Sequence, residues 1–123
     1  MEMAPKDGVE VVLGVKKDVS LGHAIMFGLG GVYVEVLKDV VFRIAPVTIT
    51  DAKQMVRGIK SAKMFEGARG RELLDIDKIV ECIGRLSQLL QDFPQIKELD
   101  MNPIIVLPKG RGVKVLDVRV VIE

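Results

Sequence analysis

The fold of this chain is decided by two stretches, ELDMNP at residues 98–103 and LDVR at residues 116–119. Alternate side chains of a β-strand share one face of the sheet, so Asp100 and Asn102 should point one way and Met101 the other. Apolar residues follow the first stretch and flank the second, as expected for two strands of a hairpin. The end of the chain is therefore predicted to be an antiparallel hairpin with one polar face.

The turn of this hairpin decides which side chains face each other. PKGRG at residues 108–112 has the composition of a turn. With a two-residue loop, counting back from the turn places Asn102 opposite Asp117 and Asp100 opposite Arg119. A four-residue loop would slide the pairing by two and keep the same side chains on one face, whereas a loop of odd length would not.

Asp100, Asn102 and Asp117 would then form a cluster of oxygen donors beside Arg119. Two carboxylates and an amide suit Mg²⁺, which prefers oxygen ligands and usually also binds substrate phosphates. The alternative is a solvated strand face with a cross-strand Asp–Arg pair worth about 0.2–1 kcal/mol. Spacing alone favours this simpler interpretation. Asp117 and Arg119 nevertheless interrupt an apolar run, where a purely structural strand would gain by staying apolar.

Length and composition limit the classes of protein that the chain can belong to. Its 123 residues make one domain or part of one, and 49% hydrophobic but only 4% aromatic residues favour an aliphatic core between a sheet and helices. A net charge of +1 without a basic stripe gives no sign of a nucleic-acid partner. The single cysteine, Cys82, excludes an intramolecular disulfide. Without a signal-like N-terminus or a long apolar span, we expect a soluble, cytoplasmic protein with no membrane contact.

The remaining segments predict an α+β fold. Their alternation and β-branched residues predict strands at residues 9–16, 24–27, 32–37 and 40–44. One helix should begin at Thr50 and Asp51, and a longer helix should run from an N-cap at Asp75 to Pro94. Strands, two helices and strands in this order indicate a largely antiparallel sheet covered on one face by two helices.

Other candidate sites carry weaker signals. GLGG at residues 28–31 has the glycines to approach a phosphate, but β-branched residues follow where a dinucleotide motif needs a helix. A tight connection between two strands explains this motif at least as well. Glu35 is a polar residue in an apolar row, as is common at sheet edges. His23, the only histidine, is interpreted as incidental, and Cys82 as a small buried side chain on the long helix.

Most of the chain is similar in sequence to one family of enzymes. The matching segments are EVVLGVKKDVSLGHAIMFGLGGVYVEVLKDVVFRIAP (10–46), MFEGARG (64–70), RLSQLLQDFPQIKELDMNPIIV (85–106) and VLDVRVV (115–121). In this order they resemble the ATP-grasp region of the ADP-forming acetyl-CoA synthetases, acyl-CoA ligases whose nucleotide-binding β subunits are related to that of succinyl-CoA synthetase. The resemblance covers essentially all 123 residues and implies the C-terminal lobe of an ATP-grasp fold.

The resemblance also implies an activity. Such ligases convert acyl-CoA, ADP and phosphate into free acid, ATP and CoA through a phosphohistidine relay with magnesium. ATP or ADP and Mg²⁺ are therefore the expected cofactors, and acyl-CoA is an expected partner. The same region occurs in multidomain acyltransferases, which makes a non-catalytic regulatory module the alternative. A purely structural assembly role is disfavoured, because it has no need for Asn102 and Asp117.

The family pattern assigns residues as well. It assigns Asn102 and Asp117 as magnesium ligands, with Asp100 as a further ligand through water, and it predicts no catalytic residue in this chain. The hinge against the adenine corresponds to residues 1–5, and the acid on the ribose corresponds to Glu10. The residues that the family pattern assigns to nucleotide binding are Glu2, Ala4, Glu10, Gly30, Gly31 and Glu35.

By the same pattern the chain divides into a hinge and ribose strand (1–10), strands with a glycine-rich connection (11–46), helices (50–93) and a metal-binding hairpin (96–122). Two features depart from the family. His23 replaces a proline of the usual D-P-x-F-G-P motif, and the chain starts at the hinge. The preceding ATP-grasp lobe, with a phosphate-binding lysine and a histidine of the relay, and a CoA-binding α subunit or domain are therefore expected as partners in a hetero-oligomer.

Overall fold

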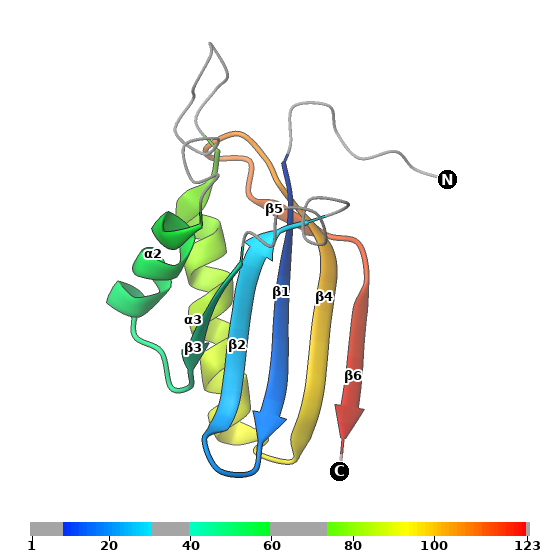
Figure 1. Ribbon diagram of the computed structural model, residues 1–123. Coiled ribbons are helices and arrows are strands. Elements are labelled where there is room, and N and C mark those ends of the chain that lie inside the picture. Colours follow the sequence, from blue (N-terminus) through cyan, green and yellow to red (C-terminus); the bar gives the residue numbers. More distant parts are fainter. Residues whose placement is uncertain (1–8, 31–39, 60–73, 123) are drawn as a thin grey trace.

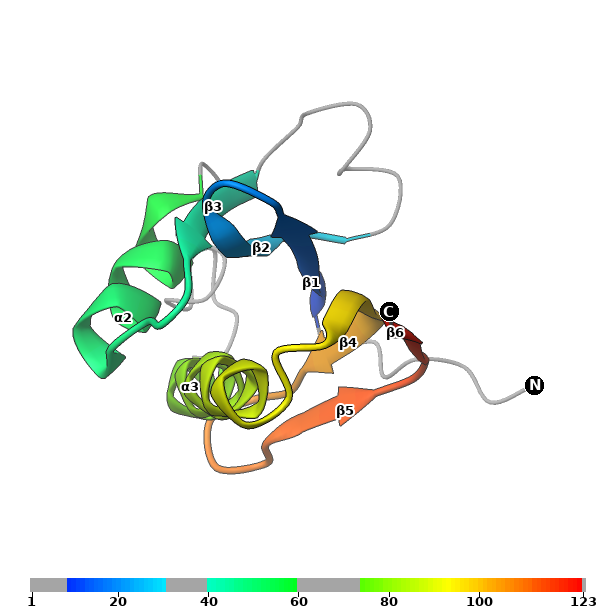
Figure 2. The ribbon, with the colours of Figure 1, turned by 90° about the horizontal axis from the view of Figure 1, so that it is seen from below.

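The computed structural model describes residues 9–30, 40–59 and 74–122 of the chain. In chain order the elements are β1 (Val9–Asp18), β2 (Gly22–Leu29), β3 (Val40–Ile44), α2 (Ile49–Gly58), α3 (Ile76–Asp92), β4 (Ile96–Val106), β5 (Val113–Val115) and β6 (Val118–Ile122). The described strands form one antiparallel sheet in the order β3-β2-β1-β4-β5, and β6 also pairs with β4. Both described helices lie on one side of this sheet, which curves around α3 (Figures 1 and 2). The predicted α+β architecture is confirmed for this part of the chain.

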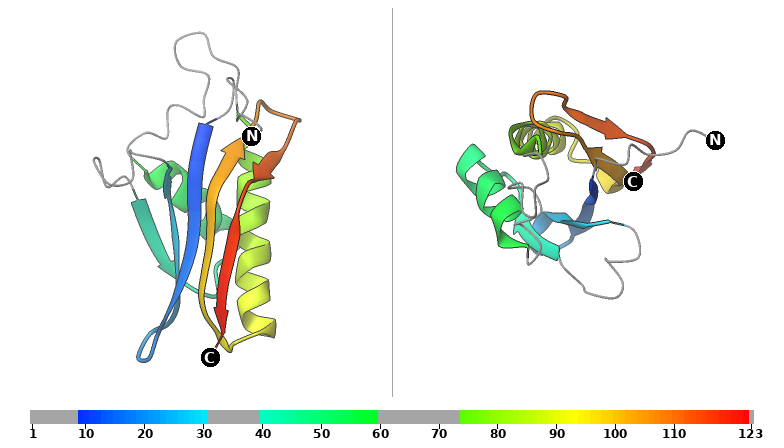
Figure 3. Two further views of the ribbon diagram at one scale, coloured as in Figure 1. Left: turned by 90° about the vertical axis from the view of Figure 1, so that its right-hand side faces the viewer. Right: turned by 90° about the horizontal axis from the view of Figure 1, so that it is seen from above.

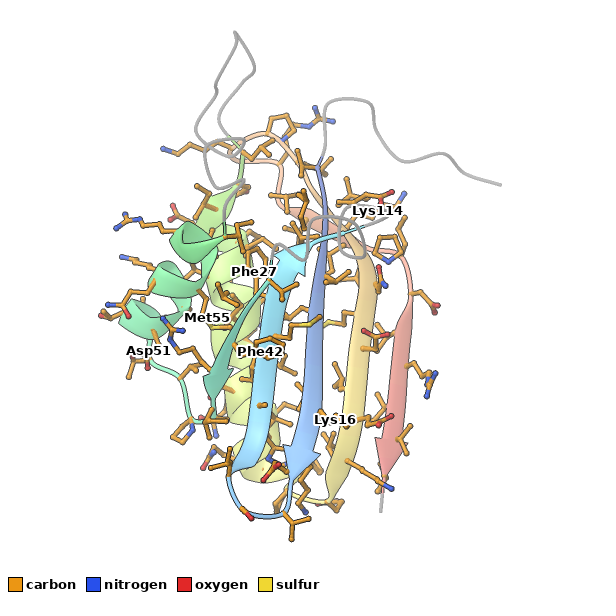
Figure 4. The ribbon with its side chains drawn as sticks, in the orientation of Figure 1. Lys16, Phe27, Phe42, Asp51, Met55 and Lys114 are labelled. Carbon is orange, nitrogen blue, oxygen red and sulfur yellow. The ribbon has the colours of Figure 1, made fainter. Side chains whose placement is uncertain are left out.

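The hydrophobic core lies between the sheet and the helices, and Figure 3 shows α3 packed along the back of the sheet. β1 contributes the alternating residues Val9, Val11, Leu13 and Val15, and α3 contributes Ile79, Ile83, Leu86 and Leu90. Phe27 from β2 and Met55 from α2, both labelled in Figure 4, are completely buried in it. Full burial of one such side chain stabilises the fold by about 1.5–3 kcal/mol, so this core holds the helices against one face of the sheet.

The first described helix begins earlier than predicted. Thr48 is the N-cap of α2, and its side chain accepts a hydrogen bond from the amide of Asp51 (3.0 Å). The Asp51 carboxylate in turn accepts a hydrogen bond from the amide of Thr48 (2.9 Å). This capping box satisfies backbone amides at the helix start, so the predicted first residue, Thr50, already lies inside α2. The hydrogen bonds from the Thr48 backbone and then its side chain lower the pKa of Asp51.

The second described helix agrees with its prediction. Asp75 is the N-cap of α3, the last helical residue is Asp92, and Pro94 follows after one further residue. Within the described ranges, neither helix is long and apolar enough to cross a membrane. The helical period and the cap were both readable in the sequence because they depend on residues only a few positions apart.

Asp75 has a second role that the sequence did not indicate. The residue is 8% exposed, and its carboxylate accepts hydrogen bonds from the amides of Lys78 (3.3 Å), Gly110 (3.2 Å) and Gly112 (2.8 Å). The amide of Asp75 also donates to the carbonyl of Leu107 (2.8 Å). One side chain thus caps α3 and fixes the turn between β4 and β5 against the start of that helix.

This turn has the predicted two-residue loop. The amide of Arg111 donates to the carbonyl of Pro108 (2.9 Å), and the amide of Leu107 donates to the carbonyl of Gly112 (3.0 Å). Gly110, the second residue of the loop, has a φ of 88°, a left-handed conformation that favours glycine.

The second strand of the predicted hairpin is divided into β5 and β6 in the structure. The pairing with β4 nevertheless keeps one register across the break, with Ile104 facing Val115 and Asp100 facing Arg119. The predicted register of the hairpin is therefore confirmed, although the strand is not continuous. The strand predicted at residues 32–37 lies outside the described residues.

Candidate functional site

The candidate site lies on the face of the sheet turned away from α2 and α3, called the open face from here on (Figure 1). Strand pairing aligns its side chains in rows that cross the sheet. One row consists of Phe42, Met26, Gly14, Asp100 and Arg119. The next row toward the β1–β2 turn consists of Ile44, Ala24, Lys16, Glu98 and Val121. The sheet therefore gathers side chains from five strands onto one surface.

A groove of about 300 Å³ crosses these two rows. Gly14 lies in its floor, because a Cβ at this position would be 3.7 Å from both Asp100 Oδ1 and Met26 Cε. Met26 and the exposed Phe42 make one side of the groove apolar. The charged side chains of the groove are Lys16, Glu98, Asp100 and Arg119. Lys16 and Phe42 are labelled in Figure 4.

Asn102 and Asp117 lie opposite each other across the hairpin, as predicted. The amide of Asn102 donates to the carbonyl of Asp117 (3.2 Å), and both residues are exposed. Asp100 is also exposed and precedes Asn102 by two residues along β4. Among the described residues, no group of three or more His, Cys, Asp or Glu side chains is arranged to hold a metal ion. A metal ion at this position would therefore depend on two carboxylates and the Asn102 amide.

A bulge in β4 separates Asn102 from the core-facing residues that follow it. Between Met101, which pairs with Leu13, and Ile104, which pairs with Val11, β4 contains one residue more than β1. The additional residue resets the alternation, so Asn102 is exposed while Ile104 is fully buried in the core. Bulges are frequent beside active sites, where they redirect a side chain.

Arg119 makes its ion pair with Glu98 rather than with the residue directly across from it. The register places Arg119 opposite Asp100, as predicted, but guanidinium Nη2 lies 3.8 Å from Glu98 Oε2. The two side chains are 74% and 40% exposed. A long and solvated pair of this kind contributes little to stability. The solvated-face interpretation of the hairpin therefore gives no strong reason for an arginine here.

Of the residues that the family pattern assigns to nucleotide binding, the structure describes Glu10 and Gly30. The amide of Gly30 donates to the carbonyl of Glu10 (2.9 Å), and Glu10 is exposed on β1. A Cβ on Gly30 would come within 3.2 Å of the Glu10 carbonyl carbon, so glycine permits this close approach of two backbones. Gly28 belongs to β2 and pairs with Val12, which makes this end of the GLGG motif part of a strand. The other assigned positions, Glu2, Ala4, Gly31 and Glu35, lie outside the described residues.

His23 is a structural residue, which corrects its interpretation as incidental. It is 9% exposed, and its Nε2 lies 2.8 Å from the carbonyl oxygen of Ile96. Lys17, its partner on β1, donates from Nζ to the carbonyl of Pro94 (3.0 Å). Both side chains tie the end of the β1–β2 hairpin to the chain entering β4. This contact joins residues more than 70 positions apart, so no local sequence pattern could have predicted it.

Cys82 is half-buried on α3 and packs against the core. Burial, followed by the nearby Glu81 carboxylate, raises the pKa of its thiol. A raised pKa keeps the sulfur protonated and unreactive near neutral pH. This agrees with the predicted structural role of Cys82.

A second hollow, of about 610 Å³, lies on the outer surface along α2 and α3. Of its two lining carboxylates, Asp77 and Glu81, Glu81 is paired with Lys78 (2.9 Å) and with Arg85 (2.8 Å) on the same helix. The hydrogen bond and charge of Lys78 lower the pKa of Glu81. This hollow thus carries a surface ion-pair network, whereas the open face carries the oxygen donors Asp100, Asn102 and Asp117.

Known proteins match nearly the whole chain. A family model described as an ATP-grasp domain matches residues 1–122. The chain belongs to the ATP-grasp family. The 4-hydroxybutyrate–CoA ligase (ADP-forming) of Nitrosopumilus maritimus is 53% identical over 115 residues, which are 94% of this chain and 16% of that protein. The β subunit of acetate–CoA ligase (ADP-forming) II from Pyrococcus furiosus is 49% identical over 119 residues, 96% of this chain and 50% of that subunit.

A solved structure shows the same relationship. Acetyl-coenzyme A synthetase 1 of Ca. Korarchaeum cryptofilum, in complex with coenzyme A and Mg-AMPPCP, matches with a TM-score of 0.90 and 41% identity. The match covers 99% of this ATP-grasp chain and 56% of that one. The predicted resemblance to the ATP-grasp region of ADP-forming acyl-CoA ligases is therefore confirmed. The chain spans half of the Pyrococcus subunit and a much smaller share of the Nitrosopumilus ligase.

Sequence reasoning missed the groove itself. Asp100 and Arg119 were recognised, but Gly14, Lys16 and Phe42 come from strands that the sequence could not arrange side by side. The one usable signal was the two-residue period of β1, which places Gly14 and Lys16 on the same face as Glu10.

Proposed function

We propose that this ATP-grasp chain is the nucleotide- and magnesium-binding portion of an ADP-forming acyl-CoA ligase. The reaction converts acyl-CoA, ADP and phosphate into the free acid, ATP and CoA through a phosphohistidine. One observation carries the proposal. In a chain homologous to these ligases, Asn102 lies across from Asp117 at the edge of the open face, with Asp100 two residues along the same strand.

The donor set fits magnesium. Carboxylate and amide oxygens are ligands that Mg²⁺ accepts, and the exposure of Asn102 and Asp117 leaves room for the waters and phosphate oxygens that it retains. Asn102 and Asp117 would be direct ligands, and Asp100 a ligand through water. When bound, magnesium neutralises charge on the phosphate oxygens during phosphoryl transfer. The Mg-AMPPCP complex of the Korarchaeum relative supports this assignment.

The order of residues along the sheet suggests how the nucleotide would lie. On β4, Ile105 pairs with Glu10, and Asp100 pairs with Gly14. Asn102 lies between these two positions. A nucleotide with its ribose at Glu10 would therefore extend its phosphates past the Asn102–Asp117 pair toward the groove. Gly30 would support Glu10 through its backbone hydrogen bond, while Glu2, Ala4, Gly31 and Glu35 would complete the site as the family pattern assigns them.

The rest of the ligase would supply the remaining chemistry. In the Korarchaeum structure, a phosphohistidine segment points towards the nucleotide binding site. We expect an equivalent histidine on a CoA-binding subunit or domain, together with the first ATP-grasp lobe, in a hetero-oligomer. These 123 residues alone should therefore not turn over acyl-CoA.

The test is magnesium-dependent ATP binding to the complete ligase that contains this chain. We expect Asp117→Ala to weaken binding strongly, because it removes an anionic ligand, and Asp100→Asn to weaken it less. Asp92→Asn, at an exposed position at the end of α3, is a matched control that should bind normally. Normal binding and turnover by Asp117→Ala would show that the hairpin carries only a solvated strand face.

The same experiment separates the ligase from the regulatory alternative. A catalytic ligase should form ATP from acyl-CoA, ADP and phosphate, and should transfer phosphate to a histidine that mass spectrometry detects. A regulatory module should bind magnesium and nucleotide through Asp117 but show neither activity.

A further inference from the structure

Arg119 is an exposed cation beside the proposed metal ligands, and its ion pair with Glu98 contributes little to stability. It follows Asp117 by two residues, which corresponds to about 7 Å along a strand. It lies opposite Asp100 and lines the groove on the open face. Asp117 directly precedes β6, and the register with β4 continues through it, so the two-residue alternation places Arg119 and Asp117 on the same face of the sheet.

The guanidinium is held loosely. Its ion pair with Glu98 spans 3.8 Å, longer than a hydrogen bond, and 74% of the Arg119 side chain is exposed. Exposed pairs contribute little to stability, so little free energy opposes its departure from Glu98. The flexible side chain of an arginine can then reach an anion on either side of its own row.

Lys16 is the other cation of the groove but is less well placed. It pairs with Glu98 from β1, whereas Arg119 lies on β6, which begins directly after Asp117. Lys16 is therefore separated from Asp117 by the width of β4. Arginine also matches the oxygens of a phosphate better, because its planar guanidinium donates two parallel hydrogen bonds.

We propose that Arg119 leaves Glu98 and binds the terminal phosphate of ATP when the nucleotide occupies the open face. Glu98 holds the guanidinium near this position when no nucleotide is present. The inference rests on the proposed function, since it takes the phosphates to extend past Asn102 and Asp117 toward the groove. ADP lacks the terminal phosphate, so Arg119 distinguishes ATP from ADP within the same site.

The test compares the affinities of the complete ligase for a non-hydrolysable ATP analogue and for ADP, each with Mg²⁺, by isothermal titration calorimetry. Arg119→Gln should weaken binding of the analogue at least about ten-fold, equivalent to about 1.4 kcal/mol, while ADP affinity changes less than about two-fold. Arg119→Lys should restore part of the lost affinity. Glu98→Gln should leave analogue binding unchanged or tighter, because it removes the competing carboxylate.

Arg85→Gln is the matched control. Arg85 is also an exposed arginine in an ion pair, with Glu81, but it lies on α3 behind the sheet, so its loss should change neither affinity. Equal weakening of both nucleotides by Arg119→Gln, or no weakening, would overturn the role of Arg119. Loss of analogue binding in Glu98→Gln would overturn the role of Glu98.

Asp117→Asn distinguishes the two levels of the proposal. If nucleotide binding by Asp117→Asn depends on Mg²⁺ concentration in the same way as binding by the wild type, the proposed metal pair is wrong, whatever the result for Arg119. If Asp117→Asn requires more Mg²⁺ for nucleotide binding but Arg119→Gln weakens the ATP analogue and ADP equally, or weakens neither, only the inference about Arg119 fails. A circular dichroism melt of each variant confirms folding, and Arg119→Lys provides the same comparison if Arg119→Gln does not fold.

Discussion

The carboxylate of Asp75 should make one of the largest polar contributions to the stability of this chain. It is almost fully buried and accepts three backbone hydrogen bonds, one from the first turn of α3 and two from the β4–β5 turn. Asp75→Ala removes all three. Loss of an N-cap costs about 1 kcal/mol.

The amides of the β4–β5 turn determine the rest of the cost. Gly110 is exposed, so water can replace its lost partner, but Gly112 is half-buried and donates at 2.8 Å. An unsatisfied buried amide costs about 1–3 kcal/mol. We therefore expect Asp75→Ala to lower the free energy of unfolding by about 2–4 kcal/mol.

Urea denaturation followed by circular dichroism measures this change, with an unchanged m-value as the condition for comparison. Asp75→Ser is the informative control, because serine can cap a helix but is too short to reach the turn. Its stability should fall between those of the wild type and Asp75→Ala. If Asp75→Ala loses less than about 0.5 kcal/mol, or if Asp75→Ser is as stable as the wild type, the tie between α3 and the β4–β5 turn has no energetic importance.

Three further predictions concern single side chains. His23→Ala leaves the carbonyl of Ile96 without its buried side-chain partner and should destabilise the fold by about 1–3 kcal/mol, measured by the same denaturation. The pKa of Asp51 is lowered in the folded state, so the ionised Asp51 carboxylate stabilises the fold. This stabilisation should be present at pH values above the ordinary pKa of 3.8 and should be lost as the pH falls through the lower pKa of the folded state. Thr48→Ala, which removes the hydrogen bond from the Thr48 side chain that helps to lower the pKa of Asp51, should reduce this acid dependence in melts between pH 5 and pH 2, roughly the range in which a paired carboxylate titrates. Since the pKa of the Cys82 thiol is raised, its reaction with iodoacetamide at neutral pH should be slower than that of a free cysteine peptide; an equal rate would contradict its burial.

Features that depend on residues close together in the chain could be predicted from the sequence. The helical period and Asp75 predict α3, and the short turn before Arg111 sets the register that brings Asn102 to Asp117. A hairpin register propagates from its turn, so two residues 15 positions apart could be paired by counting. The missed start of α2 has the same local character, since the capping box at Thr48 was present in the sequence but not recognised.

The order of the strands, in contrast, depends on contacts between segments that are far apart in the chain. β1 lies between β2 and β4, a pairing that joins the beginning of the chain to its end, and this placement creates the groove around Gly14. The bulge in β4 is defined only against β1, and the second role of Asp75 exists only because the β4–β5 turn returns to α3. Period and capping arise from residues within one or two turns of each other, whereas strand order is selected by the burial of apolar surface between distant segments.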